Sequence, residues 1–175
     1  MLLALIFMKI YLIRHGIAQE RVGGEDNPQR ALTPKGIAKT NQVAQKFKAI
    51  ETLCNLILFS PYVRAKQTAQ ILLNYNLAPT MEENTALLPN GDIQSWIHWL
   101  QNSDYTEEDN LILVGHQPDL GNWAEILIWG NSNGKITLKK AGIIGINILD
   151  MGNPIGNSEL FLLTSPKWLL TPIDS

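Results

Sequence analysis

The sequence predicts an α/β fold with a mostly parallel sheet. Three uninterrupted apolar runs, at 10–13, 56–59 and 111–114, have the length of strands that are buried on both faces. A segment with helical spacing of apolar side chains follows each run. Because strands that alternate with helices are joined by crossovers, we expect these three strands to pair in parallel.

Composition predicts a single domain over 1–175. The chain is 45% hydrophobic and has a net charge of -2, which argues against broad electrostatic binding to nucleic acid. Its one cysteine, Cys54, cannot form an internal disulfide. We therefore expect a reducing, cytoplasmic location and a thiol that is buried as a small apolar group.

The apolar start of the chain, 1–7, continues into the first run with Lys9 as the only interruption. It is too short to span a bilayer and lacks the basic start and the cleavage site of a signal peptide, so no membrane association is predicted. The first strand is complete from Met8. The sequence leaves open whether 1–7 is an N-terminal extension and whether Met1 or Met8 is the start.

The first strand is predicted to end at Arg14 and His15, and a polar loop, 19–30, follows it. Ligands of open α/β sheets bind at the carboxyl ends of the strands, so we expect the loop to lie near the mouth of a site. Thr33 as N-cap and Pro34 as the first helical residue begin a helix. Its predicted apolar face consists of Ile37, Ala44, Phe47 and Ile50.

The second strand is followed by Ser60 and Pro61, which are predicted to end it and to cap the next helix. Arg64 lies in the first turn of that helix, where a cation opposes the helix macrodipole. This unfavourable placement is explained if an anion lies between the arginine and the helix amides.

Six further elements complete the predicted fold. We expect a short strand near 80–81 and a helix with Asp92 as its N-cap. The third long strand ends at His116, and another helix follows. Two more strands, 143–149 and 160–163, are expected to extend the sheet and to include an antiparallel member.

The three strand ends carry two guanidinium and two imidazole groups without a neighbouring carboxylate cluster. These groups belong to Arg14, His15, Arg64 and His116. Guanidinium groups match phosphate oxygens, so the pattern predicts an anion pocket. One neutral imidazole can attack phosphorus, and the other can donate a hydrogen bond to the phosphoryl oxygens. Neither a metal nor another cofactor is predicted, because carboxylates at ligand spacing and glycine-rich nucleotide motifs are absent.

The ordered motifs together resemble the histidine phosphatase superfamily. The short chain and Arg30, which precedes Leu32-Thr33, are most similar to its SixA-type phosphohistidine phosphatase branch. The motifs that carry the resemblance are Arg14-His15-Gly16, Leu32-Thr33 with Gly36, Ser60-Pro61 with Arg64-Ala65 and Gln67-Thr68, and Gly115-His116 with Pro118.

The resemblance implies a phosphoglycerate mutase-like fold, a three-layer α/β/α sandwich, and a phosphoenzyme mechanism. His15 matches the nucleophile that becomes phosphorylated, and Arg14, Arg64 and His116 match the residues that hold the phosphoryl group. Arg30 either supports the pocket from behind these residues or is an ordinary surface arginine.

One position departs from the superfamily pattern. Many members carry a glutamate as general acid, and our alignment places Ala86 at that position. Glu82, Glu83 or Asp92 are the alternatives for this role, although we favour Asp92 as a helix cap.

The favoured function is hydrolysis of phosphohistidine on a partner protein through a phospho-His15 intermediate. The segment between Arg64 and His116 is short and leaves little chain for a lid, which suits a phosphate presented on a protein surface. Two alternatives stay open: a small-molecule phosphomonoesterase of the same superfamily, and a phosphate-recognition module without turnover. The second imidazole argues against mere recognition, because binding alone needs only the arginines.

Overall fold

The computed structural model describes residues 6–50 and 53–171, which form one six-stranded sheet with the order β3-β2-β4-β1-β5-β6. The first four strands run parallel, whereas β5 pairs antiparallel with both β1 and β6, as predicted. The strands are β1 (Met8–Arg14), β2 (Leu56–Phe59), β3 (Met81–Glu83), β4 (Asn110–Gly115), β5 (Ile143–Ile148) and β6 (Ser158–Thr164). Of the proposed N-terminal extension, residues 1–5 lie outside the described part.

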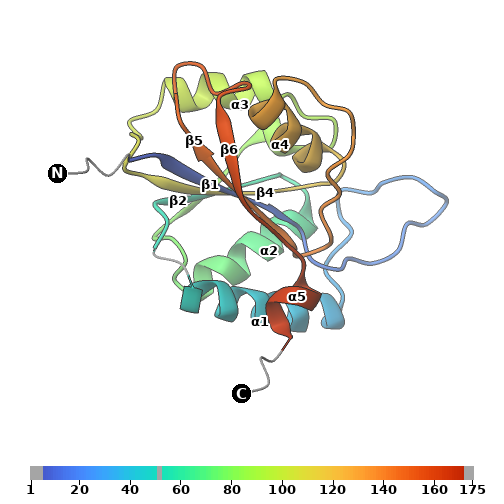
Figure 1. Cartoon of the computed structure of the whole chain (residues 1–175). Helices are drawn as coiled ribbons and strands as arrows, with labels where there is room; N and C mark the ends of the chain where they lie inside the picture. The colour runs from blue at the N-terminus through green and yellow to red at the C-terminus, as the bar shows by residue number, and fades with distance from the viewer. Residues whose placement is uncertain (1–5, 51–52, 172–175) are drawn as a thin grey trace.

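Helices cover both faces of the sheet and produce the predicted three layers (Figure 1). On one face lie α1 (Pro34–Ile50), α2 (Val63–Asn74) and α5 (Pro166–Leu170), and on the other lie α3 (Ile93–Gln101) and α4 (Asp119–Trp129). A 3-10 turn, η1 (Thr85–Leu87), precedes α3. None of the helices in the described part of the chain has the length and apolar character needed to cross a membrane.

The sheet separates two hydrophobic cores because side chains alternate along its buried strands. In β1, Ile10 and Leu12 belong to the core under α3 and α4, which includes Trp96. Tyr11 and Ile13 belong to the core under α1 and α2. Each such side chain contributes about 1.5–3 kcal/mol by burial, so the central strands are the most firmly held part of the fold.

The apolar face predicted for α1 is partly wrong. Ile37 and Ile50 are 41% and 66% exposed. The buried stripe instead contains Gly36 and Thr40, which an apolar pattern does not detect. Gly36 is required there, since a Cβ atom would overlap the backbone carbonyl of Ile17. The remaining members of the buried stripe are Val43, Ala44 and Phe47.

The cap predicted for the second helix is also wrong. Helix α2 begins at Val63 with Tyr62 as N-cap, and no side chain caps its amides. The hydroxyl of Ser60 instead lies 2.7 Å from Nε2 of His116. In contrast, Asp92 caps α3 as predicted, with hydrogen bonds from the backbone amides of Gln94 and Ser95. Cys54 is buried, as expected.

Candidate active site

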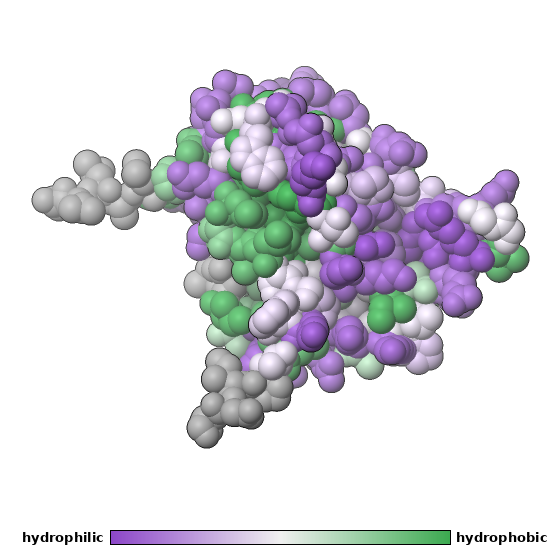
Figure 2. Space-filling model, turned by 45° about the vertical axis from the view of Figure 1, so that its right-hand side comes forward, coloured by the Kyte–Doolittle hydropathy of each residue, from purple (hydrophilic) through white to green (hydrophobic). Residues whose placement is uncertain are grey.

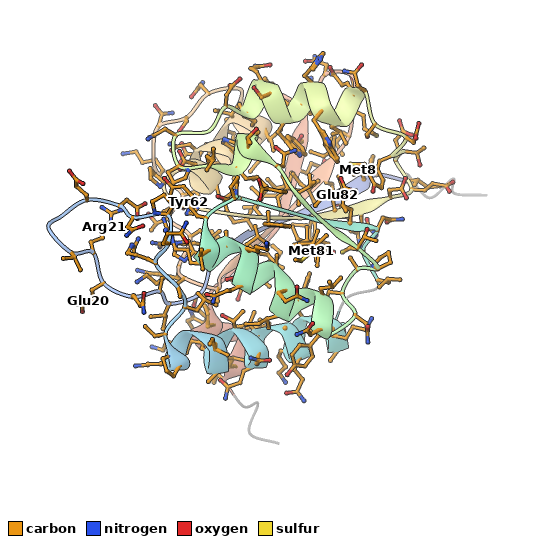
Figure 3. All side chains as sticks on the ribbon, turned by 180° about the vertical axis from the view of Figure 1, so that it is seen from behind. Met8, Glu20, Arg21, Tyr62, Met81 and Glu82 are labelled. Carbon is orange, nitrogen blue, oxygen red and sulfur yellow. The ribbon has the colours of Figure 1, made fainter. Side chains whose placement is uncertain are left out.

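One cavity of about 510 Å³ contains all four residues predicted at the strand ends. It lies between the loop after β1, the start of α2 and the loop after β4. Figure 3 shows Tyr62, at the start of α2, on the same side of the molecule as Glu20 and Arg21 of the loop after β1. The predicted residues that line the cavity are Arg14, His15, Arg64 and His116, and they are joined there by Asp26 and Arg30.

His15 presents an unprotonated ring nitrogen to the cavity. Its Nδ1 lies 2.7 Å from the carbonyl oxygen of Gly16, which can only accept, so Nδ1 carries the proton. Nε2 therefore carries a lone pair, which accepts a hydrogen bond from Nε of Arg64 at 3.1 Å. Burial, together with the nearby positive groups, lowers the pKa of His15 to about 2. The ring is consequently neutral at physiological pH.

His116 has the opposite tautomer. Nη2 of Arg64 lies 3.4 Å from its Nδ1, and because a guanidinium can only donate, Nδ1 is the acceptor. Nε2 therefore carries the proton and donates to the hydroxyl of Ser60 at 2.7 Å. Burial first, and then the charge of Arg64, lower the pKa of His116 to about 3. Both imidazoles of the site are thus neutral, and in each the ring nitrogen that faces Arg64 is a hydrogen-bond acceptor.

Asp26 is a site residue that sequence reasoning missed. Its carboxylate lies 2.8 Å from Nη2 of Arg64 and 2.5 Å from Nη2 of Arg30. Burial opposes its ionisation, but the Arg30 hydrogen bond and the Arg64 charge outweigh that effect and lower the pKa of Asp26. The sequence prediction named no carboxylate as a partner of the strand-end groups, and the structure adds this one from the loop. Nothing in the polar loop distinguishes Asp26 from Glu20 or Glu25 at the sequence level.

Arg14 contributes a donor that the protein leaves unused. Its Nη1 donates to the carbonyl oxygen of Leu138 at 2.9 Å. Its Nε is buried and has no hydrogen-bond partner among the described residues. An unsatisfied buried donor costs about 1–3 kcal/mol. A bound oxyanion would satisfy this group, so the observation supports the prediction of an anion pocket.

A second carboxylate outside the cavity, Glu125 of α4, holds the segment that positions Arg14. Its fully buried side chain accepts from the backbone amides of Asn133, Lys135 and Ile136. The same segment continues to Leu138, whose carbonyl oxygen binds Arg14. Glu125 therefore fixes a loop that aims a cavity residue, a role without any local sequence pattern.

The residues considered as general acids do not line the cavity. Asp92 is exposed at the start of α3, and Ala86 is buried in the core with α3. Glu82 and Glu83 are exposed on β3, and Figure 3 shows Glu82 away from Tyr62, toward the opposite end of the sheet near Met8. Among residues 6–50 and 53–171, no three histidine, cysteine or acidic side chains are grouped so that they could hold a metal.

The match to a family model identifies an enzyme of the phosphatase class. The chain belongs to the histidine phosphatase superfamily, and the model of branch 1 of that superfamily matches residues 10–88. An uncharacterised protein of Picosynechococcus sp. is 42% identical over 164 residues, covering 93% of this chain and 99% of that protein.

More distant relatives have named activities. The phosphohistidine phosphatase SixA of Escherichia coli is 24% identical over 154 residues, which cover 87% of this chain and 93% of that enzyme. A solved structure of the protein histidine phosphatase SixA with tungstate has a TM-score of 0.78 at 24% identity, covering 93% of this chain and 99% of that one. The α-ribazole phosphatase of Shigella flexneri has a TM-score of 0.65 at 17% identity, covering 91% and 97%.

Proposed function

We propose that this protein hydrolyses phosphohistidine on a partner protein, with His15 as the nucleophile. The observation that carries the proposal is the unprotonated Nε2 of His15 in the lining of a cavity rich in guanidinium groups, where its lone pair accepts a hydrogen bond from Arg64. A nucleophile for phosphorus needs such a lone pair, and binding alone does not. The similarity to SixA supports the phosphohistidine substrate.

The first step forms a bond between Nε2 of His15 and phosphorus and breaks the bond between phosphorus and the substrate imidazole. The departing imidazole nitrogen takes a proton from solvent. Arg14, Arg64 and His116 stabilise the negative charge on the three equatorial oxygens. Water then attacks the phosphorus of phospho-His15, releasing inorganic phosphate and restoring the free ring.

Substrate choice follows from the chemistry of the leaving group. An alkoxide needs a proton donor, a contribution of about 10²- to 10⁴-fold. Three carboxylates among the described residues line the cavity, those of Glu20, Asp26 and Asp119, and Asp26 is bound to Arg30 and Arg64, which lower its pKa. An imidazole leaving group is protonated readily, because its conjugate acid has a pKa near 6.5. This site is therefore suited to phosphoramidates more than to alkyl esters.

The test is a comparison of kcat/KM for a phosphohistidine peptide, p-nitrophenyl phosphate and glucose 6-phosphate. We expect the peptide to exceed the aryl ester, and the sugar phosphate to be at least about a hundredfold below the peptide. Activity should survive exhaustive chelation of divalent ions. Equal efficiency on the sugar phosphate and the peptide would reject the proposed substrate and favour a small-molecule phosphomonoesterase.

A further inference from the structure

A second cavity, of about 480 Å³, adjoins the active site and is surrounded by lysines. Arg14 and Lys140 line both cavities, so the two are continuous along one surface. We propose that this lysine cavity binds carboxylates on an acidic surface of the phosphoprotein substrate, an inference that rests on the proposed function. Its four lysines are Lys39 of α1, Lys139 and Lys140 just before β5, and Lys167 of α5.

Positive charge is concentrated at this place and, unlike in the active-site cavity, no carboxylate of the described residues lines the cavity. The protein has 14 lysines and arginines and a net charge of -2, yet five cationic side chains surround one cavity. Among the described residues, none of the four lysines forms a salt bridge with a carboxylate. Burial and the charges of Arg14 and Arg30 lower the pKa of Lys140, and the charge of Glu20 opposes them without reversing the direction. The like charges around the cavity repel one another, and an anionic partner relieves that repulsion.

The shape and the side chains favour a protein partner over a second phosphate group. Lys139, Lys140 and Lys167 are exposed, and lysine presents a point charge on a flexible stem. Arginine binds phosphate through two parallel hydrogen bonds, and Arg14 is the one arginine in the described lining. Figure 2 shows hydrophilic residues between the protruding loop and the lower end of the molecule, where α5 lies. Such an open, positive rim fits a broad acidic surface.

The experiment uses two histidine peptides that are phosphorylated with phosphoramidate. One carries several glutamates on both sides of the phosphohistidine, and the other carries glutamines at the same positions. Exposed ion pairs contribute little individually, so we expect kcat/KM of the wild-type protein to be about threefold to tenfold higher for the glutamate peptide. The ratio should decline as salt is raised.

The test variant is Lys139→Gln/Lys167→Gln, because these lysines line the lysine cavity but not the active-site cavity. It should reduce the ratio between the two peptides to about one while hydrolysis of phosphoramidate itself stays unchanged. The matched control, Lys46→Gln/Lys66→Gln, removes the same charge from two exposed lysines that line neither cavity, and it should keep the wild-type ratio.

Equal rates on both peptides in the wild-type protein, or a ratio that persists in Lys139→Gln/Lys167→Gln, would overturn the docking proposal while leaving phosphohistidine hydrolysis intact. Fructose 1,6-bisphosphate serves as a substrate with a second phosphate group. If Lys139→Gln/Lys167→Gln lost activity on this bisphosphate alone, the docking proposal would also be overturned, and the lysine cavity would be assigned to a second phosphate group. Failure to hydrolyse either peptide faster than glucose 6-phosphate would instead reject the proposed function. The outcomes of the two proposals are thus distinguishable.

Discussion

The two sides of the active-site cavity are built in different ways. The floor, formed by Arg14, His15 and His116, is held by the sheet and by α2. The backbone amide of His15 donates to the carbonyl oxygen of Gly115 in β4 at 3.1 Å, and that of Gly16 donates to the hydroxyl of Thr68 in α2 at 3.0 Å. The wall, formed by the loop between β1 and α1, is tied to α2 by the ion pair of Asp26 with Arg64, and Asp26 also pairs with Arg30 of the same loop.

This difference determines how an anion enters. The floor is set by buried hydrogen bonds of the backbone within the protein. The wall places a carboxylate on the arginine that a phosphoryl group needs, so substrate and Asp26 compete for Arg64. The floor should therefore govern the rate of the chemical step, whereas the wall should govern the affinity for anions.

The largest effect is expected from His15→Ala, which removes the proposed nucleophile from the floor. Turnover of a phosphohistidine peptide should fall by about a thousandfold or more, since no other group forms the covalent intermediate. Wild-type protein that is quenched in base after exposure to labelled substrate should retain a base-stable, acid-labile label. The melting temperature serves as the control for folding. Label on the His15→Ala protein would contradict the assignment.

The floor was predictable from sequence because its residues end buried strands. The apolar runs at 10–13 and 111–114 place Arg14, His15 and His116 at one sheet edge once parallel pairing is assumed, and the pairing of Arg14 with Gly115 confirms the register. An apolar run in the sequence marks a buried strand, and the end of that strand fixes which residues the backbone places at the sheet edge. The predicted role of Ser60 as a helix cap was wrong for a related reason. The same hydroxyl can cap a helix or accept from His116, and only the packing of the three strand ends selects between these two roles.

The Asp26→Asn substitution tests the wall and should have a smaller effect. Removing the competing charge should tighten tungstate binding by about threefold to tenfold, as for a partly exposed ion pair. Isothermal titration calorimetry measures the change. Glu25→Gln is the matched control, since Glu25 is adjacent and exposed but does not line the active-site cavity. Weaker tungstate binding in Asp26→Asn would show that this carboxylate organises the arginines for the anion.

The wall could not be predicted because the loop has no periodic pattern. Its conformation depends on the pairing of Asp26 with Arg30 and Arg64, which are four and 38 residues away. Charged loop residues are usually solvated, so composition gives no reason to select one of them. The same limit applies to Glu125, whose role follows from burial against backbone amides of the segment after α4. Figure 2 shows how strongly hydrophilic the protruding loop is, in contrast to the apolar area over β6.

The smallest predicted effect is the uptake of protons by His116 when an anion binds. In the free site His116 accepts from Arg64 through Nδ1, so it can donate to an oxyanion from that atom only after gaining a proton. Its pKa of about 3 reflects burial and the charges of Arg64, Arg14 and Arg30, which outweigh Asp26. A bound dianion offsets the charges of the three arginines and raises the pKa of His116. Tungstate binding should therefore take up a fraction of a proton.

Because the pKa is raised in the complex, this uptake should increase as the pH falls from about 8 to about 6. Calorimetric titrations in two buffers with different ionisation enthalpies measure the number of protons. The uptake should disappear in His116→Ala and remain in Lys66→Ala, a surface control on the same helix as Arg64. Proton release on binding, or an uptake that survives in His116→Ala, would show that His116 stays neutral. The oxyanion would then be held by the arginines alone, and the floor would contribute one imidazole to the chemistry instead of two.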